Sequence, residues 1–192
     1  MKKRLLSLVI LALSISAFAQ TGSKHLTFKG VSVEGNYEQF SQSLIKKGFV
    51  CRSSGAEAIV LSGNFMTYSD TQVIIYPYPT NQNVAMVVAM IDAGDKWPDI
   101  EKKYYSVIAA YKDKYGEPTK HVEEFSETVG DIDFLRLYAL EEGKCKYESE
   151  WQRPEGKILI AILYSAPSNY VVCYYVDCDY DNAVRKAMID DI

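Results

Sequence analysis

The sequence predicts an α+β fold of two layers, in which helices pack on one face of a mostly antiparallel meander sheet. Segments of strand length follow one another with turn residues between them, and helical patterns precede two groups of such segments. The segment at residues 84–91 is apolar on both faces, which indicates a central place in the sheet. Together these three observations favour segregated helices and a meander sheet.

The first group starts with a weakly alternating segment at residues 25–33. A helix then begins at Asn36, an N-cap residue, with Gln39 three positions later in a box-like arrangement, and it ends at Gly48. Four segments of strand character follow, at residues 49–54, 58–67, 71–79 and 84–91.

The second group contains the clearest helical pattern, at residues 97–115. Pro98 lies near its start and Gly116 just after its end. A polar link at residues 121–130 leads to a shorter helix. The remaining expected elements are that helix at residues 131–142, strands at 145–151, 157–164 and 169–177, and a last helix at 182–192.

Two segments share an outline of helix, glycine and then a strand with a cysteine. They are "LIKKGFVCRSS", residues 44–54, and "ALEEGKCKYESEW", residues 139–151. This outline is compatible with two degenerate helix-plus-meander repeats at about residues 25–118 and 119–192. A single α+β domain without a repeat explains the same pattern.

The N-terminus has the pattern of an export signal. A basic start is followed by an apolar run at residues 5–15 and by a small-x-small motif that ends at Ala19. Residues 1–19 are therefore expected to be a signal peptide, residues 20–192 a single domain, and the location periplasmic or extracellular. The alternative is a retained N-terminal anchor helix.

The net charge indicates which classes of partner are unfavourable. Residues 1–19 hold three of the 21 basic residues and none of the 25 acidic ones, so residues 20–192 carry a net charge of −7. This balance argues against nucleic acid and anionic membrane surfaces as partners. No later apolar run reaches the length of a transmembrane helix.

Four cysteines are disulfide candidates because export places them in an oxidising compartment. The sequence does not rank their three possible pairings, and free buried thiols are the alternative. Their wide scatter is unlike a zinc site of two close pairs. The candidates are Cys51, Cys145, Cys173 and Cys178.

Signals for catalysis are weak, and we expect no cofactor. His25 and His121 are the only histidines, and neither is near a candidate nucleophile in the sequence. Glycine-rich phosphate loops are absent from the sequence. Glu148 and Glu150 alternate outward from a strand, which is typical of a solvated strand face. The alternative is that paired carboxylates act as the catalytic acids of a hydrolase.

Tyrosine is the stronger signal, with 15 tyrosines against seven phenylalanines. Tyrosine combines a broad contact surface with a hydrogen-bonding tip, which suits a protein or a sugar ring. An ordinary core border is the competing explanation. The candidate ligand-binding residues are Tyr76, Tyr78, Trp151, Tyr164, Tyr174 and Tyr175.

The stretch "DCDYDN" places Asp177, Asp179 and Asp181 on alternate positions, as in a calcium loop. The sixth position of such a loop requires glycine and the twelfth glutamate, whereas this chain has Asn182 and Met188. We therefore expect no metal here, with a weak, irregular site on the three carboxylates as the alternative. We interpret the stretch as the joint between a strand and a helix that is capped by Asp181 or Asn182.

Several motifs carry a resemblance: "HLTFKGVSVEG", "KKGF", "YKDKYGEP" and "CKYESEW…GKILIAILY…YVVCYYVDCDYDN". With them the chain resembles a family of small exported proteins from Bacteroides-type bacteria that has no established activity. The helix-plus-meander outline is similar to the fold of secreted β-lactamase inhibitor proteins. The resemblance implies export and a fold, and it carries over no inhibitory residue.

These observations favour an exported, non-enzymatic module that binds a protein or a glycan. A carboxylate-based envelope hydrolase would need two acids converging in one pocket. A structural envelope protein would be a stable oligomer without a ligand pocket.

Overall fold

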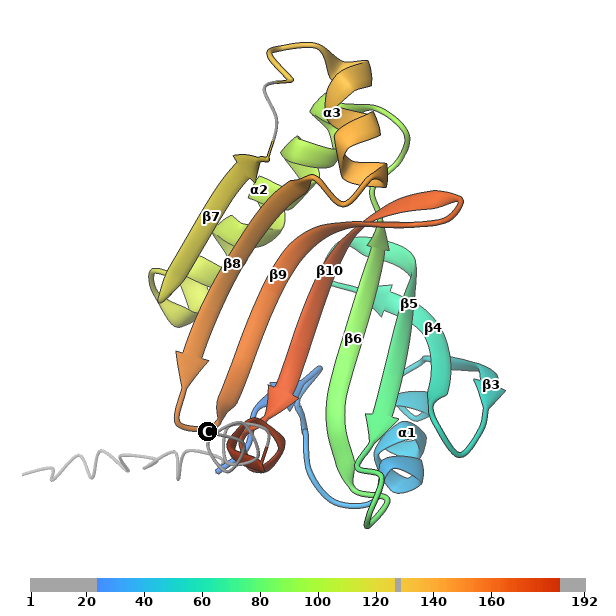
Figure 1. Ribbon diagram of the computed structural model, residues 1–192. Coiled ribbons are helices and arrows are strands. Elements are labelled where there is room, and N and C mark those ends of the chain that lie inside the picture. The colour runs from blue at the N-terminus through green and yellow to red at the C-terminus, as the bar shows by residue number, and fades with distance from the viewer. Residues whose placement is uncertain (1–23, 127–128, 184–192) are drawn as a thin grey trace, which may run out of the picture.

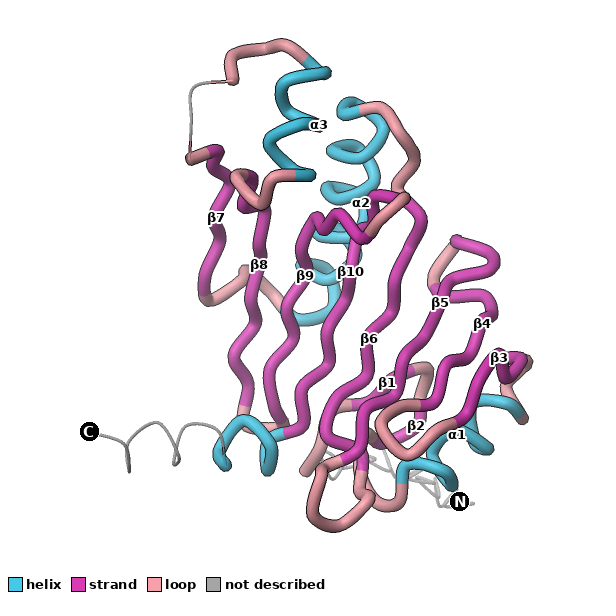
Figure 2. The backbone as a smooth tube through the Cα atoms, turned by 45° about the vertical axis from the view of Figure 1, so that its right-hand side comes forward, coloured by secondary structure: helices cyan, strands magenta, loops and turns pink. Residues whose placement is uncertain are grey.

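The computed structural model describes residues 24–126 and 129–183. Eight strands form one antiparallel sheet in the order β3-β4-β5-β6-β10-β9-β8-β7, as the continuous ribbon of strands in Figure 2 shows. The strands are β3 (Val50–Ser54), β4 (Ile59–Phe65), β5 (Tyr68–Pro77), β6 (Val84–Asp92), β7 (Lys120–Phe125), β8 (Cys145–Arg153), β9 (Gly156–Ser165) and β10 (Ser168–Asp177).

Helices α1 (Tyr37–Ile45) and α2 (Trp97–Tyr115) pack on one face of this sheet and lie behind it in Figure 1. Helix α3 (Asp133–Glu141) packs beside α2 at the end of the sheet where β8 starts. A small hairpin of β1 (Thr27–Phe28) and β2 (Val31–Ser32) completes the fold. The expected α+β architecture is confirmed, with an antiparallel meander sheet and segregated helices.

The core lies between the helices and the facing side chains of the sheet. Alternate residues of each strand point to this side, so that Ile158, Ile160 and Ile162 of β9 are all buried. Trp97 and Tyr104 of α2 are buried against them from the helix layer. On the opposite face the described residues place only the short helical turn at residues 178–183, where Asp181 contacts Lys157 and Gln152 near one end of the sheet.

The order of elements repeats. Helix α1 precedes the meander β3–β6, and α2 precedes β7–β10, with α3 inserted after β7. The two meanders meet at the antiparallel pair β6–β10. The helix-plus-meander outline expected from the sequence is therefore present twice, but it divides before α2, whereas the expected halves at residues 25–118 and 119–192 divide after it.

Two local expectations are wrong. Residues 120–125, expected to be part of a polar link, form the edge strand β7, because Val122 and the charged residues around it alternate against β8. Residues 178–183 are helical, so the helix begins directly after β10 and not at Asn182. Its first turn is capped by Asp177, whose Oδ2 accepts a hydrogen bond from the Asp179 backbone N–H at 3.0 Å.

In the structure all four cysteines are free, and the disulfide expectation stays a prediction. Cys51 lies on the edge strand β3, far across the sheet from the others. Cys173 of β10 is in register with Ser149 of β8 across Ile160, and Cys145 lies four residues further along β8, so the two cysteines are well over ~10 Å apart, beyond the reach of a disulfide. Cys178 follows Cys173 along an extended strand, which keeps these two apart as well.

Candidate functional site

The six candidate aromatic residues do not share one surface. Trp151 and Tyr175 are only 2% and 5% exposed and point into the core, so the structure removes them from any binding face. Tyr164 lies on the helix side of β9 and packs against the core. The physical reason is strand alternation, since these three residues share the inward parity of their strands. Tyr76 and Tyr174 have the outward parity.

Tyr76 and Tyr174 belong to the open face, the side of the sheet turned toward the viewer in Figure 1. Tyr174 pairs with Val88 on one side and Leu159 on the other, so that these side chains form a row across β6, β10 and β9. A parallel row has Met90, Val172 and Ala161. We define the open-face patch as Ile74, Tyr76, Met86, Val88, Met90, Leu159, Ala161, Val172 and Tyr174.

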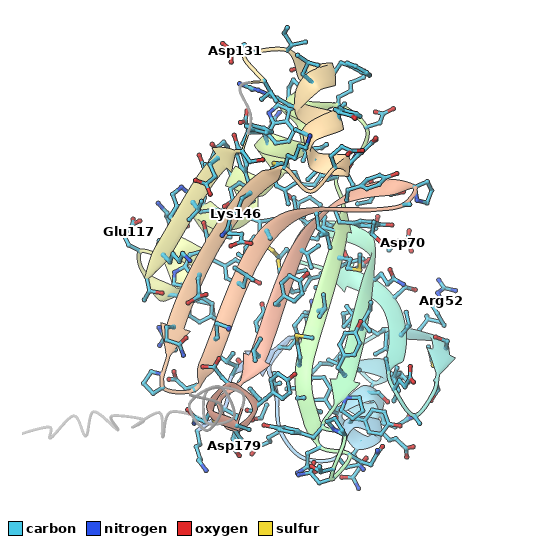
Figure 3. All side chains as sticks on the ribbon, in the orientation of Figure 1. Arg52, Asp70, Glu117, Asp131, Lys146 and Asp179 are labelled. Atoms are coloured by element: carbon cyan, nitrogen blue, oxygen red, sulfur yellow. The ribbon has the colours of Figure 1, made fainter. Side chains whose placement is uncertain are left out.

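Charged side chains border this patch. Lys146, Glu148 and Glu150 of β8 alternate outward beside it, and Figure 3 shows Lys146 in front of the sheet. Lys157 of β9 pairs with Val176 and extends the border toward the end of the sheet. Four cavities of about 190 to 460 Å³ lie elsewhere, against the helices and the N-terminal segment. The open-face patch is therefore a layer of half-buried apolar side chains with a charged rim, in which Val88 and Val172 are themselves buried.

The structure brings together a second set of residues from opposite ends of the chain, which we call the His25 cluster: His25, Asp177 and Cys178. His25 Nδ1 lies 2.6 Å from Asp177 Oδ1 and 3.7 Å from Cys178 Sγ. Cys178 Sγ lies 3.9 Å from the same carboxylate oxygen. All three residues are largely buried, with side-chain exposures of 12% for His25 and 4% for Asp177.

The N-terminal segment positions His25 because its next residues are anchored in the core. Leu26 is buried, and its backbone N–H donates to the Glu155 carbonyl at 3.2 Å. The fully buried Phe28 ring stacks on Phe65 at 5.1 Å and meets the edge of Tyr175 at 5.2 Å. These contacts hold the segment against the end of β10, where Asp177 and Cys178 follow the last core residue.

A cysteine beside a histidine raises the question of a nucleophile. A Cys–His pair requires the thiol and the orienting carboxylate on different ring nitrogens. Here Glu34 Oε2 lies 3.4 Å from Nε2 of His25, but at Nδ1 the Asp177 carboxylate, at 2.6 Å, is closer than the Cys178 thiol, at 3.7 Å, and competes with it. Burial, followed by the neighbouring carboxylates Asp177 and Asp179, raises the pKa of the Cys178 thiol, which disfavours the thiolate. This geometry does not activate a nucleophile.

His121 lies in another polar group, on the helix side of β7 and β8. Its Nδ1 is 2.7 Å from Ser149 Oγ, and its Nε2 is 3.1 Å from Glu123 Oε1, an order that resembles a serine triad. Ser149, however, is fully buried beneath Tyr104, whose hydroxyl lies 3.0 Å from it. A substrate cannot reach this hydroxyl. The contacts among His121, Ser149 and Tyr104 instead join the edge strand to α2.

Tyr78, the remaining aromatic candidate, lies just after β5 beside the His25 cluster. Its ring meets the edge of Tyr180 at 5.4 Å. Its hydroxyl is buried and has no hydrogen-bond partner among the described residues. Burial, and then the charges of Asp177 and Asp179, raise the pKa of Tyr78 well above its ordinary value. Tyr78 lines a cavity of about 300 Å³ together with His25, Glu34, Asp177 and Asp179.

The three alternating aspartates do not converge on one point. Asp177 belongs to the His25 cluster, whereas Asp181 faces Lys157 at 3.4 Å and Gln152 at 3.1 Å. Asp179 lies at the lower end of the sheet in Figure 3 and lines the cavity of Tyr78. The expectation that this stretch is not a calcium loop remains a prediction. The potential metal ligands lie instead in the His25 cluster, which the alternating pattern of the aspartates did not indicate.

No protein family, curated protein or solved structure matches the chain. Among the described helices, none combines the length and apolar character needed to cross a bilayer. The sequence signalled the outward Tyr76 and Tyr174 but missed the His25 cluster, since its members are 152 and 153 residues apart. Only the three-dimensional path of the N-terminal segment reveals it.

Proposed function

We propose that this protein is an exported, non-enzymatic binding module that recognises a protein partner through the open-face patch. The observation that supports this proposal is the pair of half-buried apolar side chains Tyr174 and Leu159, which lie beside the buried Val88 on the sheet face opposite α1 and α2. Contiguous apolar patches that keep part of their surface accessible, as the half-buried Tyr76, Leu159 and Tyr174 do, are found at interaction surfaces. Export is proposed from the pattern of residues 1–19.

A protein fits this surface better than a sugar does. The patch extends over β5, β6, β10 and β9 and has aliphatic and methionine side chains at its centre, with Lys146 and Glu148 on its border. Protein interfaces have such an apolar core and charged rim. Met86 and Met90 can adjust their shape to an apolar partner. Sugar sites instead use polar groups that converge on hydroxyls, and this patch offers only the Tyr76 and Tyr174 hydroxyls.

A carboxylate-based hydrolase has less support. Glu148 and Glu150 lie two positions apart on the same strand, with their side chains at the rim. Lys146 Nζ lies 3.8 Å from Glu148 Oε2, which compensates one of the two charges. Neither carboxylate lines any of the four cavities described above.

The proposal is tested with the Leu159→Glu variant, which places a charge at the centre of the patch. The wild-type protein is used to capture partners from an envelope extract, and each captured protein is purified and titrated against wild type and variant. We expect the variant to bind one such partner at least about tenfold more weakly, because the interface would have to bury an unpaired carboxylate. A polysaccharide panel and a molar-mass measurement distinguish a glycan and a second copy of the chain.

The matched control is Ile132→Glu, at a residue 55% exposed just before α3 and outside the open face. This variant should bind the partner as wild type does. Equal affinity of the Leu159→Glu variant and wild type for every captured protein would contradict the proposal. Binding of a polysaccharide alone would replace the protein partner with a glycan.

A further inference from the structure

The His25 cluster combines three kinds of metal-binding atoms: an imidazole nitrogen, a carboxylate oxygen and a thiol sulfur. These atoms all lie within 4.8 Å of one another. A mixed set of nitrogen, oxygen and sulfur ligands suits zinc, which accepts all three in tetrahedral sites. We propose that His25 Nδ1, Asp177 Oδ1 and Cys178 Sγ bind a zinc ion.

The spacing of the ligand atoms is close to that of a tetrahedron. With ordinary zinc bond lengths, ligand atoms of a tetrahedral site are about 3.3 to 3.6 Å apart. Cys178 Sγ already lies 3.7 Å from His25 Nδ1 and 3.9 Å from Asp177 Oδ1. Only the His25–Asp177 pair, at 2.6 Å, has to open, by less than an ångström. A small rotation of these two side chains would admit the ion.

Glu34 orients the imidazole for this role. Its Oε2 lies 3.4 Å from Nε2 of His25, on the side of the ring opposite the cluster. With zinc on Nδ1, this carboxylate would accept the proton that remains on Nε2, as in carboxylate–histidine–zinc arrangements. Without the ion, a neutral ring with its proton on Nε2 would place two lone pairs face to face between Nδ1 and Asp177 Oδ1. A cation between them, either a proton or a metal ion, resolves this contact.

His25 and Asp177 also line a cavity of about 300 Å³, which would leave room for a fourth ligand such as a water. Tyr78 lines the same cavity, and its buried hydroxyl has no hydrogen-bond partner in the described part of the chain. Asp179 Oδ1 lies 3.8 Å from Cys178 Sγ at the margin, and it does not belong to the group of mutually close ligand atoms.

Binding exchanges protons for the metal ion. Zinc displaces the thiol proton of Cys178 and any proton that His25 holds on Nδ1, and both protons pass to the solvent. The Asp177 carboxylate contributes its negative charge and loses no proton. The bound ion would join the segment before β1 to the end of β10, two regions that are 152 residues apart. Zinc should therefore raise the melting temperature.

The test uses untagged protein that has been freed of metal with a chelator. We expect it to bind one equivalent of zinc in competition with a chromophoric chelator, and to melt at a higher temperature with zinc. Cobalt serves as a second probe, because coordination by Cys178 should give a sulfur-to-cobalt charge-transfer absorption. Absence of both zinc binding and this absorption in the wild-type protein would overturn the proposal.

Single substitutions test which residues bind the zinc ion. Cys178→Ser should abolish the charge-transfer absorption and weaken zinc binding more than about a hundredfold, beyond the effect of losing an outer partner. Glu34→Gln should weaken binding by about 10- to 100-fold and keep the absorption. Cys51→Ser removes an exposed thiol on the far edge of the sheet, so this control should bind zinc as wild type does. Loss of binding in the Cys51→Ser variant, or full binding in the Cys178→Ser variant, would contradict the assignment.

Discussion

The four cysteine side chains differ in their reactivity because their surroundings differ. Burial raises the pKa of Cys145 and of Cys173 to about 12, whereas Cys51 is exposed on the edge strand β3. The thiolate is the reactive form of cysteine. In metal-free native protein at neutral pH we expect an alkylating reagent to label Cys51 and to leave Cys145, Cys173 and Cys178 unmodified.

Peptide mass spectrometry of the labelled protein checks this expectation, and labelling in denaturant shows that all four thiols can react. The Cys51→Ser variant should remain unlabelled in its native state. Rapid native labelling of Cys173 would contradict the burial that the structure assigns to it.

Three tyrosines of the core should make the fold sensitive to alkali. Burial raises the pKa of Tyr104 to about 12, and burial also raises those of Tyr111 and Tyr175, whose hydroxyls bond to each other. In the unfolded chain their pKa is about 10. The contribution of these tyrosines to the free energy of unfolding is thus fully present below pH 10. It is lost as the pH rises through 12, because in that window only the unfolded chain releases the tyrosine protons.

At pH 11 the loss should be about 1 kcal/mol for each of these tyrosines, relative to pH 9. Urea denaturation at the two pH values measures it. The Tyr104→Phe variant should lose less stability between them than wild type does. Equal urea midpoints of the wild-type protein at pH 9 and pH 11 would contradict the burial of these hydroxyls.

Among the strands, β4 contains a glycine that the core requires. A Cβ atom at Gly63 would lie 2.6 Å from Cδ1 of the buried Phe49 ring, closer than two such atoms can approach. We therefore expect Gly63→Ala to lower the free energy of unfolding by about 1 to 3 kcal/mol through overpacking. At Gly55, before β4, the nearest atom would be 3.8 Å away, so Gly55→Ala is the matched control.

Urea denaturation of both variants measures the difference. The Gly55→Ala variant should remain within about 0.5 kcal/mol of wild type, as is usual for surface substitutions. Equal stability of the two variants would show that Phe49 does not pack on β4 as described.

Most strands and helices were predictable because each has a strong local pattern. The helix at Trp97–Tyr115 combines Pro98 with apolar residues at helical spacing, and β9 alternates over its length. β7 was missed because an edge strand bears charges on both faces and resembles a loop. The helical start at Cys178 was missed because several neighbouring residues can serve as caps.

The candidate sites were less predictable, for two physical reasons. Strand parity decides which aromatic residues face outward, and tyrosine is common on both sides, so Tyr174 and Tyr175 differ only by their position in the pleat. The His25 cluster depends on a contact between chain ends. No local pattern links His25 to Asp177, and only the anchoring of Phe28 in the core brings them together.

For the molecule as a whole, the two halves share one hydrophobic core. Phe28 contacts Phe65 of the first meander and Tyr175 of the second, and β6 pairs with β10 along seven residues. We expect a single cooperative unfolding transition, with equal calorimetric and van't Hoff enthalpies in scanning calorimetry. Two separated transitions would show that the halves unfold independently, and would contradict the shared core.

The open-face patch is the part of the molecule on which the proposed function depends, and photo-crosslinking tests its role directly. A photoreactive amino acid replaces Leu159 in one variant and Ile132 in another, and each is irradiated with the captured partner. The partner should crosslink at position 159, at the centre of the open-face patch, and not at position 132. Crosslinking at position 132 alone would place the interface at α3 and contradict a binding role for the sheet.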